Sequence, residues 1–254
     1  MTTPAGPAGS AGPATPGQGL AGRVALVAGG AGHIGGGIAE AMLAGGATVV
    51  VPSRDPGRVA TLRERLGAVA GDRLAALVGD VGTPDGAEWV RDEVLGRFGA
   101  VDAVAAAVGG WWQGPVVWET PVEEFDRVLA ANLRPHFLLA RAMLPAMVDR
   151  PGASYTIING DAAERPVVRS GLASVTAAAQ LMLMRTLAAE ARGHAVRVNL
   201  LLLGPVRAPG RGRPEWLTTA EVGAMAAWLA SDAARMVSGS ILRLPERPPP
   251  PDAP

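Results

Sequence analysis

The sequence has no cysteine and no lysine, and it contains only one tyrosine and three histidines among its 254 residues. The missing cysteines exclude disulfides, thiolate nucleophiles and thiolate metal ligands. The histidines at positions 33, 136 and 194 are too scattered to form a recognisable metal signature, so we expect no metal site. The missing lysines mean that no lysine ammonium can take part in the chemistry of this chain.

Neither positive nor negative charge is in excess, because 23 arginines balance 23 acidic residues. A chain with zero formal charge offers no broad attraction for nucleic acid or for an anionic membrane surface. We expect no apolar run to reach the roughly 18 to 20 residues that span a bilayer. We therefore expect a cytoplasmic protein without a nucleic-acid or membrane partner.

Composition divides the chain into a central domain and two tails. Residues 1–19 are rich in proline, alanine and glycine and lack the features of a secretory signal, and residues 245–254 are rich in proline. We predict that both tails lack fixed structure. Residues 20–244 are long enough for one α/β domain.

Within this domain, short apolar runs alternate with segments of helix length. Such alternation predicts parallel strands joined by right-handed crossovers, with helices on both faces of the sheet. The fold class is therefore α/β, a doubly wound Rossmann-type sheet of about seven strands. The expected strands are 24–28, 48–51, 74–78, 103–108, 156–158, 196–203 and 240–244.

A glycine-rich turn follows the first expected strand. Gly30, Gly32 and Gly35 satisfy the pattern G-x-G-x-x-G between that strand and a helix. This context is typical of a dinucleotide site, where the amides at the helix N-terminus face a pyrophosphate. An ordinary strand-to-helix turn is the alternative.

This turn, with the segments that follow it in order, resembles the short-chain dehydrogenase/reductase family from about residue 22 to residue 244. Against the family pattern T-G-x-x-x-G-x-G, Ala28 stands at the threonine, while Gly29 and Gly35 match. His33 replaces the middle glycine, where its imidazole could either contact the phosphate or obstruct it.

The resemblance also predicts the cofactor. Ser53 and Arg54 follow the second strand and resemble members that prefer NADP, since a guanidinium can pair with a 2′-phosphate. Asp80 and Val81 match the pair that contacts adenine. We expect NADP(H), if any cofactor binds. The other cofactor-contacting positions that the resemblance implies are Gly32, Ile34, Gly109 and Val206.

The residues of the family's catalytic group are mostly replaced. Residues 183–190 resemble L-T-R-x-L-A-x-E, and counting back from them puts Ala173 and Ala177 at the tyrosine and lysine of Y-x-x-x-K. Neither alanine can transfer a proton. The serine position falls at Gly160, or at Asp161 if the loop shifts by one residue.

Three further features bear on catalysis. Asn132 matches the family's helical asparagine, while its N-N-A-G segment has become residues 106–109, Ala-Ala-Val-Gly. Tyr155 lies about five residues, or some 17 Å, before the active end of its strand and is expected to be out of reach. Asp161 is the best remaining acid or base, and a plain turn former after the fifth strand is the alternative.

Two further features lie around the expected cleft. Trp111, Trp112 and Trp118 could line an apolar cleft, fill vacated space or be buried between subunits. Only about ten residues separate Pro209 from Thr219, so the helical flap that covers substrate in the family is expected to be largely missing.

The first functional hypothesis is a family member without standard carbonyl-reductase activity, acting as a pseudoenzyme, as a ligand-binding module or as the non-catalytic partner of an active paralogue. The alternative is an atypical NADP(H)-dependent oxidoreductase or a non-redox enzyme that uses Asp161 and Asn132. The family's contact through helices near 122–148 and 173–191 implies a homo-oligomer or a hetero-oligomer. The small-molecule ligand or substrate is not specified by the sequence.

Overall fold

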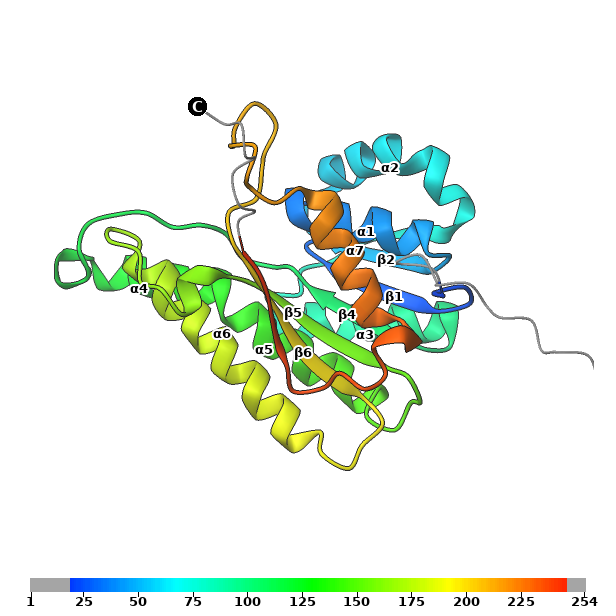
Figure 1. Cartoon of the computed structure of the whole chain (residues 1–254). Helices are drawn as coiled ribbons and strands as arrows, with labels where there is room; N and C mark the ends of the chain where they lie inside the picture. Colours follow the sequence, from blue (N-terminus) through cyan, green and yellow to red (C-terminus); the bar gives the residue numbers. More distant parts are fainter. Residues whose placement is uncertain (1–18, 246–254) are drawn as a thin grey trace, which may run out of the picture.

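A sheet of seven parallel strands forms the centre of the molecule, in the order β3-β2-β1-β4-β5-β6-β7 (Figure 1). The chain is described by a computed structural model over residues 19–245. The strand order reverses between β1 and β4, and in open α/β sheets ligands bind beyond the carboxyl ends of the strands at such a reversal. The strands are β1 Val24–Ala28, β2 Thr48–Ser53, β3 Leu74–Val78, β4 Ala103–Ala106, β5 Ser154–Gly160, β6 Arg197–Leu203 and β7 Ile241–Leu244.

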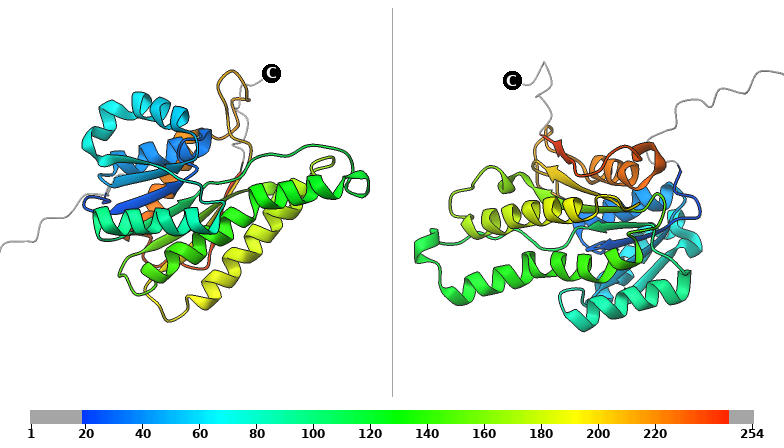
Figure 2. Two further views of the ribbon diagram at one scale, coloured as in Figure 1. Left: turned by 180° about the vertical axis from the view of Figure 1, so that it is seen from behind. Right: turned by 90° about the horizontal axis from the view of Figure 1, so that it is seen from below.

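Helices cover both faces of this sheet (Figures 1 and 2). The helices α1, α2 and α7 lie on one face, and α3, α5 and α6 lie on the other. Their bounds are α1 His33–Ala44, α2 Pro56–Ala70, α3 Pro84–Phe98, α4 Val122–Asn132, α5 Arg134–Met143, α6 Gly171–Glu190 and α7 Thr219–Ala230. The long α6 lies beside α4, as both views of Figure 2 show.

Successive side chains of a strand point to opposite faces of the sheet, so each strand contributes to two apolar layers. In β1, Val24 and Leu26 contribute to the core under α3, α5 and α6, whereas Ala25 and Val27 contribute to the core under α1, α2 and α7. Every residue of β1 is buried, because helices cover both faces of a parallel sheet.

Side-chain caps define where several helices begin. The Asp55 carboxylate accepts from the first amides of α2, and Thr83 caps α3. Thr218 and Glu221 form a reciprocal capping box at the start of α7. Such caps satisfy amides that have no partner within the helix, so they place the first turns close to the strand ends.

The structure confirms the predicted fold class, with boundaries that differ by a few residues. The fourth strand ends at Ala106 rather than Val108, and the second continues to Ser53. The carbonyl of Val108, beyond the end of this strand, bonds to the ring of His136 on α5. The tails predicted at 1–19 and 245–254 lie outside the described residues, apart from Gly19 and Pro245.

One expectation about apolar segments was wrong. By length and composition alone, α6 could cross a membrane, with a mean hydropathy of 1.3 over its most apolar window. It contacts β5, β6 and α4, and Leu181 and Met184 belong to the apolar core. The sequence prediction missed it because polar residues, among them Gln180 and Arg185, interrupt its apolar run.

Candidate functional site

The glycine turn between β1 and α1 is packed directly against the end of β4. Gly29 has a φ of +81°, and a Cβ added there would lie 2.1 Å from the Ala107 carbonyl oxygen. A Cβ on Gly35 would lie 2.2 Å from the Gly29 oxygen. Only glycine fits at either position.

The N-terminus of α1 is suited to an anion. Gly32 precedes the helix, and within residues 19–245 no side chain caps it and no acidic residue lies in its first turn. The first amides of a helix lack partners inside the helix, and the helix dipole favours negative charge there. A phosphate group fits this end of α1.

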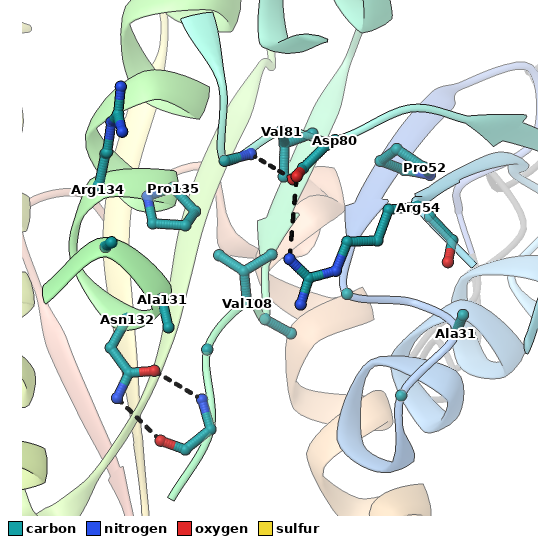
Figure 3. A pocket seen from close by; sticks show the side chains of 18 of the residues that line it. Ala31, Pro52, Arg54, Asp80, Val81, Val108, Ala131, Asn132, Arg134 and Pro135 are labelled. Atoms are coloured by element: carbon teal, nitrogen blue, oxygen red, sulfur yellow. Dashed lines mark hydrogen bonds and ion pairs between the residues drawn. The ribbon is translucent and has the colours of Figure 1, made fainter. Parts of the chain in front are cut away.

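A first cavity of about 720 Å³ opens next to this turn, on the side of β2 and β3 (Figure 3). It brings together residues from the ends of four strands and from α4. The predicted site residues that line it are Gly29, Gly32, Ser53, Arg54, Asp80, Val81, Gly109 and Asn132. Gly35 lines neither this cavity nor the next. It packs against the backbone of Gly29 and so allows the turn to be tight.

Arg54 extends across the first cavity toward Asp80 (Figure 3). Its guanidinium lies 3.9 Å from the Asp80 carboxylate, and the Arg54 side chain is 81% exposed. Asp80 also accepts a hydrogen bond of 2.9 Å from the Gly82 amide. An exposed pair at this distance contributes little to stability, so a phosphate can compete for Arg54 at small cost.

One predicted residue of the first cavity, Ser53, is already hydrogen-bonded, and one residue that was not predicted, Arg58, lines the cavity. The Ser53 hydroxyl is engaged in its own turn, where it accepts from the Asp55 amide at 3.1 Å. Arg58, which the sequence analysis missed, lines the cavity in the first turn of α2 and lies 3.5 Å from the Asp55 carboxylate. The sequence does contain a signal for Arg58. Asp55 before Pro56 predicts a helix start, and this start places Arg58 at the same edge of the sheet as Arg54. Arg127 and Arg134 are two further missed arginines in the lining.

A second cavity of about 790 Å³ lies at the ends of β5 and β6. Both cavities are lined by Asn132 and by residues 107–111, so the two join at the end of β4. The predicted site residues in the second cavity are His33, Ile34, Gly109, Asn132, Asp161 and Val206. Ala173 and Ala177 of α6 also line it.

Asn132 is held in place by hydrogen bonds. Its Nδ2 donates to the Gly110 carbonyl and its Oδ1 accepts from the Gly110 amide, both at 2.9 Å (Figure 3). The Gln180 side chain donates to the Asn132 carbonyl at 2.7 Å. Asn132 therefore positions the segment that joins the two cavities, and its side-chain amide is already engaged.

Asp161 opens a short 3-10 turn, Asp161–Ala163, directly after β5. Its carbonyl accepts from the amides of Glu164 and Arg165, while its carboxylate makes no hydrogen bond or ion pair within the described part of the chain. The structure thus presents an unpaired, half-buried carboxylate to the second cavity.

His33 connects α1 to the loop between β6 and α7, because its Nε2 contacts the Arg207 carbonyl. The loop, residues 204–218, contains no helix and is braced internally. Ala208 and Arg211 exchange two backbone hydrogen bonds of 2.9 Å, and the Arg207 guanidinium bonds to the carbonyls of Arg213 and Pro214. The expected shortening of the flap is therefore confirmed.

Comparison with known proteins identifies the family. Residues 23–214 match the sequence profile described as short chain dehydrogenase. The chain belongs to the short-chain dehydrogenase/reductase family. Members of this oxidoreductase family typically bind NAD(P)H.

Individual relatives agree with this assignment. The human dehydrogenase/reductase SDR family member 2, mitochondrial, is 33% identical over 191 residues, which cover 74% of this chain and 66% of the relative. The 1-deoxy-11-beta-hydroxypentalenate dehydrogenase of Streptomyces arenae is 33% identical over 196 residues, covering 74% and 68%. The chain thus spans about two thirds of the curated relatives that it matches.

A solved structure is similar over nearly the whole domain. The blue fluorescent protein from a metagenomic library, in complex with NADPH, is 25% identical with a TM-score of 0.81. The similarity covers 90% of this chain and 98% of that chain. The short-chain dehydrogenase/reductase fold therefore extends over nearly the whole domain.

The three tryptophans near the cleft of this family member have different environments. Trp112 is buried in a small apolar cluster with Val128, Leu172 and Ala173. Its indole donates to Glu124, whose pKa is lowered to about 2 by hydrogen bonds, first from Arg127 and then from Trp112. Trp111 lines both cavities. Trp118 is 84% exposed.

The single tyrosine of this short-chain dehydrogenase/reductase lies away from both cavities. Tyr155 is fully buried near the amino end of β5, and its hydroxyl has no hydrogen-bond partner among the described residues. Burial raises its pKa far above the ordinary value. The expectation that Tyr155 is out of reach is confirmed.

Replacing this phenol should not lower the stability of the fold. We expect Tyr155→Phe to keep the free energy of unfolding equal or to raise it by up to about 1 kcal/mol, because a buried hydroxyl without a partner is removed. Urea unfolding of the two proteins measures the difference. A clear loss of stability would show that the hydroxyl makes a favourable contact.

Proposed function

We propose that this chain binds NADP(H) across the two cavities and does not reduce carbonyls with the residues that its family normally uses. In this role it is a pseudoenzyme, a ligand-binding module or the non-catalytic partner subunit of an active paralogue. The observation that carries the proposal is the pair of alanines, Ala173 and Ala177, in the wall of the second cavity.

The residues present fit the cofactor. Gly29 and Gly35 form a turn with no room for a side chain, beside an uncapped helix N-terminus that favours a pyrophosphate. Arg54 and Arg58 supply guanidinium groups at the edge where a 2′-phosphate would lie. When bound, NADP(H) would supply or accept a hydride at its nicotinamide ring. The NADPH complex of a similar protein supports this assignment.

The side chains at the family's Y-x-x-x-K positions argue against standard catalysis. The methyl groups of Ala173 and Ala177 can neither donate a proton nor hold a ribose hydroxyl. No lysine elsewhere in the sequence can substitute, and Tyr155 is buried away from the cavities. Proton transfer would need a group from outside this pair.

Titration with NADPH and NADH tests the cofactor assignment. We expect NADPH to bind more tightly than NADH, and Arg54→Ala to weaken NADPH binding about tenfold with little change for NADH, since one charge-assisted contact to the 2′-phosphate is lost. Arg63→Ala is the matched control, because Arg63 lies on the same helix as Arg58 but lines neither cavity. Equal affinities for NADPH and NADH would overturn the NADP assignment, and no binding of either would overturn the proposed function.

Asp161 supports the alternative, an atypical oxidoreductase or a non-redox enzyme. Its unpaired carboxylate and the positioned Asn132 both line the second cavity. A carboxylate at this place could act as a general acid or base. Substrate-dependent NADPH oxidation that disappears in Asp161→Asn would favour this alternative over the non-catalytic function.

We further propose that the chain forms oligomers through α5 and α6. Phe137 on α5 and Val175 and Met182 on α6 are apolar side chains that are each about half exposed. The short-chain dehydrogenase/reductase resemblance implies a contact between subunits through these helices, and burying such side chains favours association.

A charge placed on α6 should weaken this association. We expect Met182→Arg to weaken self-association about tenfold or more, because a guanidinium would have to be desolvated in an apolar contact. Light scattering after gel filtration measures the mass. Met236→Arg is the control, since Met236 is exposed but lies beyond α7. If the purified wild-type chain is a monomer and binds a paralogue that carries Y-x-x-x-K, the assembly is a hetero-oligomer instead.

A further inference from the structure

The second cavity contains few charges. Apart from His33, its charged side chains within the described residues are Asp161 and Arg211. Most other side chains in its wall are apolar, including Ile34, Val206 and Trp216. A charge next to such a wall is less screened than in water, so its sign influences which ligands bind.

Asp161 occupies a rigid position in this wall. Its carbonyl accepts from the Glu164 and Arg165 amides at 3.0 and 2.9 Å, which fixes its backbone at the end of β5. Glu164 in turn forms a two-pronged ion pair with Arg243 on β7. The turn that carries Asp161 is therefore closed by its own backbone hydrogen bonds and held to β7 by one ion pair.

Arg211 has the opposite charge but a more solvated place. It lies on the loop between β6 and α7, where its side chain is exposed to solvent and makes no hydrogen bond or ion pair with the described residues. Solvent and salt screen such a charge more strongly than a half-buried one. Asp161 should therefore dominate the electrostatic potential at the inner wall.

The two redox forms of the cofactor differ in charge only at the nicotinamide ring. The ring is positively charged in NADP⁺ and neutral in NADPH, while the adenosine phosphates are the same. Contacts of the first cavity, such as Arg54, therefore act on both forms alike. A fixed charge can therefore discriminate between them only from a place near the nicotinamide ring, which the proposed function puts in the second cavity.

We propose that Asp161 makes this chain bind NADP⁺ more tightly than NADPH, so that it reports the redox state of the cofactor pool. The inference rests on the proposed function, because it places the nicotinamide half in the second cavity. The absence of lysine strengthens it, since no ammonium offsets the carboxylate there.

Calorimetric titration of the purified full chain with NADP⁺ and with NADPH tests this inference. For the wild type we expect NADP⁺ to bind about tenfold more tightly than NADPH, as one partly screened charge pair predicts. Asp161→Asn keeps the shape of the side chain and should bring the ratio of the two affinities close to one. Arg211→Gln should raise the ratio above that of the wild type.

Asp126→Asn is the control, because Asp126 is an exposed aspartate on α4 that lines neither cavity. Its affinity ratio should equal that of the wild type. Binding of both forms with equal affinity in the wild type, or a preference that persists in Asp161→Asn, overturns the inference and leaves the proposed function standing. Failure of both forms to bind overturns the two together.

Discussion

Gly29→Ala should reduce NADPH affinity by about 100-fold or more and lower the free energy of unfolding by about 2–4 kcal/mol. The added Cβ would lie 2.1 Å from the Ala107 oxygen and 2.8 Å from the Ala107 carbonyl carbon, both backbone atoms that cannot turn aside. The turn would have to move away from β4, and the first amides of α1 would move with it. Calorimetry with NADPH and urea unfolding measure the two effects.

Gly99→Ala separates this steric effect from the cost of the backbone conformation. Gly99 has a φ of +75°, close to that of Gly29, but a Cβ there would meet nothing within 4 Å. We expect a loss of only about 1 kcal/mol of stability and unchanged NADPH affinity. NADPH affinity in Gly29→Ala equal to that of Gly99→Ala would contradict a cofactor-binding role for the turn.

His136 should make the stability of the fold depend on pH. Its side chain is fully buried on α5, with one ring nitrogen 3.0 Å from the Val108 carbonyl and Nδ1 without a partner in the described part of the chain. Burial lowers its pKa from 6.5 to about 4, although the hydrogen bond to Val108 acts in the opposite direction. The folded protein therefore resists protonation that the unfolded chain accepts.

The direction of the pH dependence follows from this difference in the pKa of His136 between the folded and the unfolded chain. The stability contributed by neutral His136 is complete above pH 6.5 and is lost as the pH falls toward 4. We expect the free energy of unfolding to fall by about 2.5 kcal/mol between pH 7 and pH 4.5, measured by urea unfolding at each pH. His136→Gln keeps a donor for the Val108 carbonyl and should remove most of this pH dependence.

His194→Gln is the matched control, since His194 is an exposed residue that pairs with Asp149. It should retain the pH dependence of the wild type. A fall in stability between pH 7 and pH 4.5 that is equally large in His136→Gln would mean that other groups cause it.

Much of the fold could be predicted because its signals are local. The short continuous apolar run Val24–Ala28, followed by glycines and a helical pattern, predicts a buried strand, a tight turn and a helix without knowledge of the rest. The repetition of such units predicts the parallel sheet. The family motifs likewise lie at strand ends, so the sequence could predict that their residues meet at one edge.

Side chains that depend on partners from distant elements were harder to predict. The contact of His33 with the Arg207 carbonyl joins residues far apart in the sequence, and nothing near His33 indicates it. The burial of Trp112 beside Leu172 and Ala173 depends on how α6 lies against α4. The engagement of Asn132 with Gly110 depends on where β4 ends.

The sequence by itself determined the doubly wound sheet, the glycine turn and the chemical groups that this chain lacks, because composition and periodicity act within single elements. Only the tertiary structure decided that Arg127 and Arg134 line the same cavity as Arg54, that the two cavities join through residues 107–111, and that the Asp161 carboxylate in the second has no partner among the described residues. These properties depend on the distances and burial that arise when separate elements pack together.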